Sequence, residues 1–288
     1  SVEELSLEIE KANVAFGLRQ IVPSDLHKPY IDEIVLVSKT GQKLLKEPDL
    51  IDVWFDSGAM PFAQWHYPFD TKVLGPDQFP ADYIAEGVDQ TRGWFYTLHA
   101  LATLVKDNVA FKNVISNGLV LDKNGEKMSK RKGNVVDPFA TLQKYGADAT
   151  RWYMISNSDP WENLKFDLEG ITEVRNKFFG TLFNTYNFFA IYANVDKFEY
   201  HPETAISSDK RPEIDRWILS KLNTLIQAYL STMDQFEPTS AARLIETFVC
   251  DELSNWHVRL SRRRFWKTDS SMDKRAAFET LYECLICV

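Results

Sequence analysis

The sequence predicts a mixed α/β region followed by an all-α region, and three observations support this. From Ala81 to about Asn157, short apolar runs alternate with helical stripes in the order strand, helix, strand, helix. Beyond Asn157 no strand pattern recurs. The rest of the chain carries apolar residues at helical spacing between short polar segments, which is typical of a helix bundle.

The α/β part begins with a strand over 83–85 that leads into Glu86 and Gly87. A helix follows, with apolar residues at helical spacing: Trp94, Leu98, Leu101 and Val105. A second strand is predicted over 114–121, and a helix near Asp137, where Asp caps the first turn and Pro138 fits it. Because ligands of parallel sheets lie beyond the carboxyl ends of the strands, Glu86 and the loop 122–134 mark a candidate ligand edge.

Secondary structure is also predicted for the segments before and after this α/β part. A strand is expected within 31–37, with a turn over 39–42, and the aromatic, Gly- and Pro-containing segment 52–69 is expected to be irregular and to wall a pocket. Helices are expected over 168–193, from about 213, and after Pro238. The predicted apolar stripe of the last helix is Ile245, Val249, Leu253, Trp256 and Leu260.

Composition excludes several classes of protein. Hydrophobic residues make up 44% of the 288 residues, which is ample for packed cores. No apolar run reaches the roughly 20 residues of a membrane span, and acidic residues stand where a signal peptide is basic, so we expect a soluble cytoplasmic protein. The net charge of -8 argues against a general nucleic-acid coat but leaves open a selective RNA binder with a local basic face.

The cysteines give no disulfide framework. Cys284 and Cys287 form a C-x-x-C pattern, but no second pair or histidine pair accompanies it, and the neighbouring residues are apolar. We expect two buried thiols on one helix face and no protein-bound metal.

A loop between two glycines concentrates positive charge at the candidate ligand edge. Lys127, Lys130, Arg131 and Lys132 could neutralise a polyphosphate, and a flexible loop could close over a nucleotide. It is not a Walker motif. The alternative is a solvated basic loop, which is the usual meaning of such a cluster.

Several strings together resemble the isoleucyl branch of the class I aminoacyl-tRNA synthetases. The loop residues Lys127, Met128, Ser129, Lys130 and Arg131 resemble the signature loop of class I. Residues 52–58 and 86–95 resemble two further blocks of the isoleucyl enzymes, in that family's order, and 117–121, 144–149 and 255–264 also fit. Thr91 and Arg131 are similar to the eukaryote-like branch, which also occurs in bacteria.

The resemblance implies roles for individual residues. Glu86 and Gly87 would hold the aminoacyl-adenylate, Asp89 and Gln90 would contact its ribose and amino-acid parts, and Trp54 and Trp94 would wall the isoleucine pocket. Lys127 and Lys130 would be catalytic at the ATP phosphates, with Met128, Ser129 and Arg131 completing the nucleotide-binding loop. Taken singly, each also has a structural explanation: a helix-end charge for Glu86, a cap for Asp89 and core packing for the tryptophans.

The helical part holds the strongest basic cluster, Arg259, Arg262, Arg263, Arg264 and Lys267, beside Trp256 and Trp266. Phosphate neutralisation and aromatic surface suit RNA; a solvated helix end is the alternative. The resemblance implies that these residues bind the anticodon stem-loop. The implied substrates and partners are isoleucine, ATP with Mg²⁺, and isoleucine tRNA, and we expect a monomer without membrane contact.

The resemblance also predicts a domain division and missing parts. Residues 1–50 would return from an inserted editing domain, 51–157 would form the second half of a Rossmann-like nucleotide-binding core, and 158–288 a truncated helical anticodon-binding domain. The family's H-I-G-H-type block is absent from the sequence, so we expect an internal fragment that is inactive alone. A different class I synthetase, such as a valyl enzyme, and a non-catalytic RNA-binding module are the alternatives.

Overall fold

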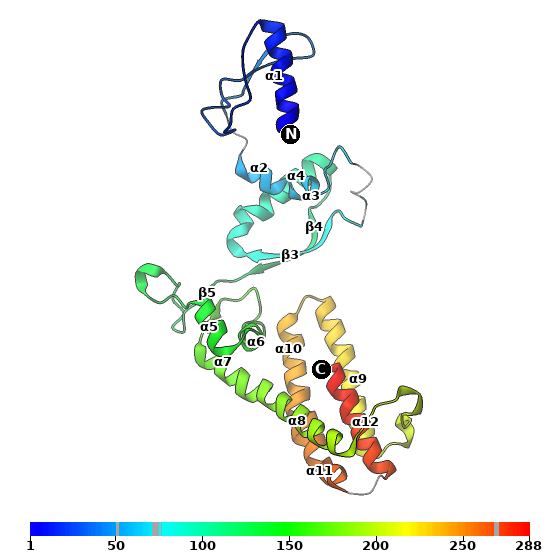
Figure 1. Cartoon of the computed structure of the whole chain (residues 1–288). Helices are drawn as coiled ribbons and strands as arrows, with labels where there is room; N and C mark the ends of the chain where they lie inside the picture. Colours follow the sequence, from blue (N-terminus) through cyan, green and yellow to red (C-terminus); the bar gives the residue numbers. More distant parts are fainter. Residues whose placement is uncertain (50–51, 71–74, 76, 268–270) are drawn as a thin grey trace. The chain divides into compact units, whose positions relative to one another are not determined.

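The computed structural model describes residues 1–49, 52–70, 75, 77–267 and 271–288, and the predicted domain boundary at 50–51 lies outside them. The chain divides into two compact units. Unit 1 comprises Ser1–Gly75 and Thr97–Asn108, and unit 2 comprises Pro76–Tyr96 and Val109–Val288 (Figure 1).

Unit 1 starts with helix α1 (Val2–Phe16) and a short hairpin of β1 (Val35–Val37) and β2 (Lys43–Leu45). The strands are antiparallel and Val35 is opposite Leu45, so the predicted turn over 39–42 is confirmed, while the strand is shorter than the 31–37 expected. The side chain of Gln20 ties the hairpin to the end of α1. Its Nε2 donates to the Val35 carbonyl at 2.9 Å, and its backbone N–H donates to Asn13 Oδ1 at 2.9 Å.

The aromatic segment 52–69 is more regular than predicted, because it contains α2 (Val53–Gly58) and α3 (Met60–Ala63). The carboxylate of Asp52 caps α2 by accepting from the Trp54 backbone N–H at 2.6 Å. Gly58 permits close packing on α4 (Trp94–Lys106), since a Cβ there would lie 2.8 Å from the Thr97 carbonyl oxygen. Most of α4 belongs to unit 1, and its first residues belong to unit 2.

One sheet of unit 2 pairs β3 (Ala81–Gly87) with β4 (Phe111–Asn117). The strands are parallel, as predicted, with Glu86 opposite Ser116 and Gly87 opposite Asn117. The 3₁₀ turn η1 (Val88–Arg92) follows β3 and leads into α4. The carboxyl ends of both strands therefore lie at one edge, next to the segment that carries the predicted adenylate-binding residues.

The predicted strand over 114–121 is two strands in two different sheets. After β4 ends at Asn117, β5 (Val120–Leu121) pairs in parallel with β6 (Leu164–Lys165). Gly118 makes the junction, because its N–H donates to the Pro160 carbonyl at 2.8 Å and a Cβ there would lie 2.2 Å from the Glu162 carbonyl oxygen. β6 also contradicts the expectation that no strand follows Asn157.

In the sequence, β5 is followed by the loop turn η2 (Lys130–Lys132), α5 (Pro138–Tyr145) and α6 (Ala147–Asn157). The predicted Asp137 cap of α5 is confirmed, since its carboxylate accepts from the N–H groups of Phe139 and Ala140 at 2.8 and 3.1 Å. The helices α5 and α6 share a small core with β6 and α7 (Leu168–Val174), made of Ala149, Tyr153, Leu164, Phe166 and Ile171. We call it the loop-side core.

The remaining chain is helical (Figure 1). A long helix is formed by α7, the π-helical turn η3 (Arg175–Phe179) and α8 (Gly180–Asp196), close to the predicted 168–193. After two short 3₁₀ turns, η4 (Pro202–Thr204) and η5 (Ser208–Lys210), α9 (Glu213–Asp234) begins where a helix was predicted. Then come α10 (Pro238–Thr247), the π-helical η6 (Phe248–Val258), α11 (Arg259–Trp266) and α12 (Met272–Cys287).

The π-helical segment η6 changes which face of its helix is buried. Val249 and Leu253 are buried as predicted, but Trp256 and Leu260 are 57% and 58% exposed. The buried positions recur instead at every fourth residue: Val249, Leu253, His257, Ser261 and Phe265. A π-helix has more residues per turn than an α-helix. A stripe drawn with the α-helical spacing therefore selects exposed residues instead of buried ones after Leu253.

Candidate nucleotide-binding loop and basic helical surface

The loop 122–134 begins with a turn organised by Asp122. Its Oδ1 accepts from the backbone N–H groups of Asn124 and Glu126, at 2.9 and 2.8 Å. Gly125 adopts a φ of 84°, which suits glycine at this position. Lys127 then lies opposite Leu121 in an antiparallel bridge. The first half of the loop is therefore a small hairpin that extends from β5.

The second half of the loop turns back through η2. The Ser129 hydroxyl accepts from the Lys132 N–H at 3.2 Å, which caps this 3₁₀ turn. The Ser129 N–H itself donates to Asn134 Oδ1 at 2.9 Å. Ser129 is therefore part of the loop's own framework, and its hydroxyl already accepts one hydrogen bond inside the loop.

The basic side chains of the loop are exposed, whereas its methionine is partly buried. Lys127, Lys130 and Arg131 are exposed, and no ion pair holds any of them within the part of the chain that the structure describes. Lys132 is paired with Glu126 at 2.9 Å. Met128 is partly buried and packs against the loop-side core. Three unpaired cations around an anchored methionine can neutralise an anionic group such as a polyphosphate.

At the end of β3, hydrogen bonds link two of the predicted adenylate-binding residues, Asp89 and Gln90, to the start of α4. The carboxylate of Glu86 is exposed, and Asp89 Oδ2 accepts from Gln90 Nε2 at 3.2 Å. Gln90 Oε1 accepts from the Trp94 N–H at 2.9 Å, which caps the start of α4. Gly87 lies close to the Asp89 carboxylate, since a Cβ at position 87 would lie 2.6 Å from Asp89 Oδ1 and the carboxylate would have to move.

The structure does not bring every predicted residue together. Among the described residues, no hydrogen bond or ion pair joins Glu86 to the loop 122–134. Trp54 is 48% exposed and lies in unit 1, whereas Trp94 is partly buried and lies in unit 2. Both tryptophans stay predicted pocket residues.

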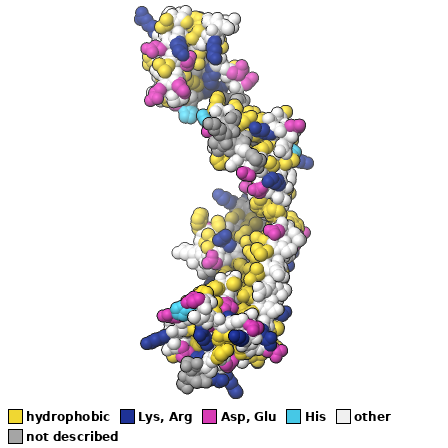
Figure 2. Space-filling view, turned by 90° about the vertical axis from the view of Figure 1, so that its right-hand side faces the viewer, with side chains coloured by type: hydrophobic (Ala, Val, Ile, Leu, Met, Phe, Trp, Pro, Cys, Tyr) yellow, Lys and Arg dark blue, Asp and Glu magenta, His cyan; other side chains and the backbone are white. Residues whose placement is uncertain are grey.

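Four of the five basic residues predicted to face tRNA are exposed. Arg259, Arg262, Arg263 and Lys267 are exposed, as are Trp256 and Trp266, the last two at 57% and 54%. On the face drawn in Figure 2, basic and acidic side chains are interspersed over the helical bundle. This face of the bundle is therefore not uniformly basic.

Arg264 corrects the prediction, because it is held inside the bundle. Its Nη1 and Nη2 donate to the two carboxylate oxygens of Asp215 at 2.7 and 2.6 Å, and Nη2 also donates to the Asp273 carbonyl at 2.9 Å. The side chain of Arg264 is only 12% exposed, and that of Asp215 is fully buried. This guanidinium is occupied by the fold, so we remove it from the RNA-facing set.

Asp215 and His257 complete a buried polar cluster that the sequence did not reveal. His257 Nε2 lies 3.1 Å from Asp215 Oδ1 and both side chains are fully buried. Burial alone would raise the pKa of Asp215, but the hydrogen bonds from Arg264 and His257 outweigh it and leave the pKa below its ordinary value. The cluster is therefore charged and joins α9 to η6 and α11.

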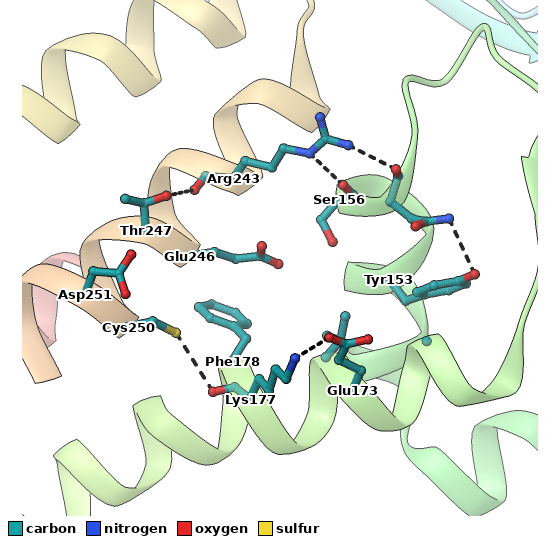
Figure 3. Close-up of a pocket in the computed structure, with 13 residues that line it drawn as sticks. Tyr153, Ser156, Glu173, Lys177, Phe178, Arg243, Glu246, Thr247, Cys250 and Asp251 are labelled. Carbon is teal, nitrogen blue, oxygen red and sulfur yellow. Dashed lines mark hydrogen bonds and ion pairs between the residues drawn. The ribbon is translucent and has the colours of Figure 1, made fainter. Parts of the chain in front are cut away.

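A pocket of about 440 Å³ lies between α6, α7, η3, α10 and η6 (Figure 3). Arg243 spans one side, with Nε and Nη2 donating to the carbonyls of Ser156 and Asn157 at 2.9 and 3.0 Å. These carbonyls end α6, where a cation is favoured by the helix dipole. Lys177 is paired with Glu173, and none of the predicted site residues lines this pocket. In this pocket Arg243 joins α10 to α6.

The C-x-x-C pattern also differs from its prediction. Cys284 is buried and burial raises the pKa of its thiol, but Cys287 is exposed, because the two sulfurs lie near the end of α12 and only one faces the core. Within the described residues, no group of three or more His, Cys, Asp or Glu side chains could hold a metal ion. In the same residues, no helix is long and apolar enough to cross a membrane.

Comparison with known families decides what this arrangement belongs to. Residues 2–167 match the family model "tRNA synthetases class I (I, L, M and V)". The chain belongs to the class I tRNA synthetases. Residues 215–287 match the anticodon-binding domain of tRNA ligases, so this class I synthetase sequence combines catalytic-domain and anticodon-binding parts, as the predicted fold class required.

Relatives of high sequence identity are named isoleucine–tRNA ligase. The chain is 62% identical to the isoleucine–tRNA ligase of Cytophaga hutchinsonii and 60% identical to that of Bacteroides fragilis, in both cases over 99% of the chain. The identity to the isoleucine–tRNA ligase of Thermus thermophilus is 46% over 92% of the chain. The chain covers only 26%, 27% and 25% of these relatives, so it spans about a quarter of their length.

Solved class I structures share the fold. The methionyl-tRNA synthetase of Mycobacterium tuberculosis, bound by methionyl-adenylate, has a TM-score of 0.65 at 17% identity, over 99% of this chain and 56% of that one. The LeuRS of Agrobacterium radiobacter K84, in a ternary complex with tRNA and LeuAMS, has a TM-score of 0.66 at 19% identity, over 94% of this chain and 34% of that one. At these identities the likeness concerns the fold.

Two residues that hold the loop were missed by the sequence analysis. Asp122 and Asn134 flank the signature string and bond to each other, yet neither was assigned a role. The signal was present, since Asp-x-Asn-Gly is a turn pattern and Asn134 directly follows Gly133.

Proposed function

We propose that this chain is part of an isoleucine–tRNA ligase, contributing the nucleotide-binding loop of the catalytic core and an RNA-binding helical domain. The observation that carries the proposal is the exposed cation set Lys127, Lys130 and Arg131 on a structured loop, in a chain 62% identical to a ligase of that name. The complete enzyme would join isoleucine to its tRNA in two steps.

In the first step, an isoleucine carboxylate oxygen attacks the α-phosphorus of ATP. The bond from that phosphorus to the bridging oxygen of the β-phosphate breaks, and pyrophosphate leaves. Lys127 and Lys130 would stabilise the negative charge that gathers on the departing pyrophosphate, as positioned cations do in such transfers. Mg²⁺ would arrive with the nucleotide and add charge neutralisation there.

In the second step, a hydroxyl of the terminal tRNA ribose attacks the carbonyl carbon of isoleucyl-adenylate, and AMP leaves. No side chain of the chain has to act as a nucleophile, since positioning and charge stabilisation supply the rate increase. Glu86, Asp89 and Gln90, at the carboxyl end of β3, would orient the adenylate by accepting and donating hydrogen bonds. Trp54 and Trp94 would wall the isoleucine side chain.

For the helical domain we propose recognition of the isoleucine tRNA anticodon stem-loop. Arg259, Arg262, Arg263 and Lys267 would neutralise phosphates, and Trp256 and Trp266 would offer surfaces on which bases stack. We retain the domain division at residues 50/51 and 157/158, and a monomeric cytoplasmic enzyme, as parts of the same proposal.

The role of the loop is tested by Lys130→Ala in the complete ligase that contains this chain. Lys123→Ala is the matched control, because Lys123 is an exposed lysine in the preceding turn and outside the proposed site. Loss of one preorganised charge should lower kcat for isoleucine-dependent ATP–pyrophosphate exchange by roughly 100-fold. Equal rates for the two variants would refute the assignment of Lys130.

A further inference from the structure

Asn134 binds the loop at three points although it lies outside the signature string. Its Oδ1 accepts from the Ser129 N–H at 2.9 Å, and its Nδ2 donates to Asp122 Oδ2 at 2.9 Å and to the Lys127 carbonyl at 3.4 Å. The donor and acceptor ends of one amide thus bind the two halves of the loop. The side chain of Asn134 is partly buried, which keeps water from replacing these bonds easily.

Asp122 is the other half of this interaction. One carboxylate oxygen organises the turn through the N–H groups of Asn124 and Glu126, and the other accepts from Asn134. The hydrogen bond from Asn134 is the largest cause that holds the pKa of Asp122 below its ordinary value. The carboxylate is therefore charged at neutral pH, and its bond to Asn134 is charge-assisted.

The loop 122–134 has one apolar side chain, that of Met128. Met128 lies between the exposed Lys127 and the partly buried Ser129 and packs on the loop-side core. It also lines an apolar cavity of about 290 Å³ together with Val120, Val136, Leu142, Met154 and Phe166. Because methionine is flexible and can repack in such a space, its packing alone leaves the loop's shape open, and the hydrogen bonds of Asn134 to Ser129 and Asp122 constrain it further.

We propose that Asp122 and Asn134 form a clasp that holds the loop in the shape presenting Lys127 and Lys130 to the nucleotide phosphates. Both are positioning residues and neither touches the reacting atoms. This rests on the proposed nucleotide-binding role of the loop. Without the clasp, the conformation that presents Lys127 and Lys130 to the phosphates becomes one of several loop conformations. The rate of adenylate formation then falls in proportion to the fraction of molecules in that conformation.

The chemistry of the pair allows a reciprocal exchange as a test. Asn134→Asp removes the Nδ2 donor and places a second carboxylate next to that of Asp122, so the two repel each other and the clasp should break. Asp122→Asn combined with Asn134→Asp restores one donor and one acceptor. The amide introduced at position 122 keeps an oxygen that accepts from the turn and gains an N–H that donates to position 134. The carboxylate introduced at position 134 can still accept from the Ser129 N–H, so only the 3.4 Å bond to the Lys127 carbonyl has no replacement.

The first measurement is hydrogen exchange of the 122–134 segment in this 288-residue chain, with peptides from α10 as the internal reference. In Asn134→Asp the segment should exchange roughly tenfold faster, the value of one charge-assisted hydrogen bond. The reciprocal double variant should return to within about threefold of the unaltered chain. Unchanged exchange in Asn134→Asp, or equal exchange in single and double variants, would overturn the clasp.

The second measurement is ATP–pyrophosphate exchange by the complete ligase with the same substitutions. Asn134→Asp should lower kcat and raise the KM for ATP, with the KM for isoleucine unchanged, and the double variant should recover. A fall in total active enzyme with both KM values unchanged would mean that the pair only supports folding, and would overturn the positioning role. If hydrogen exchange responds as predicted but no variant, nor the unaltered enzyme, uses isoleucine, the proposed function fails while the clasp stands.

Discussion

The guanidinium of Arg264 binds the carboxylate of Asp215 with two hydrogen bonds, 2.7 and 2.6 Å long, across 49 residues of sequence. Asp215 lies in the first turn of α9 and Arg264 in α11. The pair is almost completely removed from water, so its partners depend on each other: removing one leaves the other as an uncompensated buried charge.

Replacing Arg264 should therefore destabilise the helical bundle, while replacing its neighbour should not. We expect Arg264→Gln to lower the free energy of unfolding by about 3 kcal/mol, the cost of breaking a buried pair. Arg263→Gln, on an exposed side chain of the same helix, should change it by less than about 0.5 kcal/mol. Urea denaturation followed by circular dichroism measures both. Equal stability of the two variants would mean that the buried pair contributes little.

The charge on Asp215 makes the bundle sensitive to acid in a defined direction. Its folded pKa lies below the ordinary 3.8, so the stabilisation is present at any pH above that value and is lost as the pH falls through the folded pKa. The difference in unfolding free energy between the unaltered chain and Asp215→Asn should therefore be large at about pH 6 and shrink below about pH 4. A difference that stays constant from about pH 6 to about pH 2 would contradict a charged Asp215.

The exposed arginines should affect RNA binding without affecting stability. For Arg259→Gln, Arg262→Gln and Arg263→Gln, the slope of log affinity for isoleucine tRNA against log salt should fall by up to about 1 for each phosphate that is no longer neutralised. Lys112→Gln, on β4, is the control and should leave the slope unchanged. Filter binding at several salt concentrations gives the slopes. Slopes equal to that of the unaltered chain in all three arginine variants would remove this surface from the RNA site.

Gly118 and Gly133 should respond differently to alanine, because one is limited by space and the other by backbone shape. At Gly118 a Cβ would lie 2.2 Å from the Glu162 carbonyl oxygen, so Gly118→Ala must displace the connection to β6 and should cost about 3 kcal/mol. At Gly133 nothing lies within 4 Å, and the φ of 67° alone should cost about 1 kcal/mol. Thermal unfolding compares the stability of the two variants. A greater loss of stability for Gly133→Ala than for Gly118→Ala would contradict the close packing of Gly118 on Glu162.

The elements that the sequence predicted well are those with long periodic patterns or strong end signals. The helix α9 and the Asp137 cap of α5 were located because several residues agree on each. The two-residue strand β6 has no periodicity to detect, and its partner β5 lies more than 40 residues earlier, so only the folded chain reveals the pair.

The candidate site shows the same limits at the level of single side chains. Arg263 and Arg264 are adjacent and equally basic, yet successive residues of a helix point about 100° apart, so one faces solvent and the other Asp215. The π-helical η6 rotates that face further, so Trp256 lies on the surface, as its place beside the basic cluster indicated and the apolar stripe did not. A sequence pattern indicates a basic helix, whereas its phase relative to the core depends on tertiary packing.

The most direct test of the central claim is amino-acid-dependent ATP–pyrophosphate exchange by the complete protein to which we assign this chain. Isoleucine, valine, leucine and methionine would be compared by kcat/KM at fixed ATP. We predict the highest value with isoleucine, because a pocket shaped for its side chain loses apolar contact when one methylene group is missing. A higher kcat/KM for valine, leucine or methionine would contradict the isoleucine assignment, and no exchange with any of the four would contradict the proposed reaction.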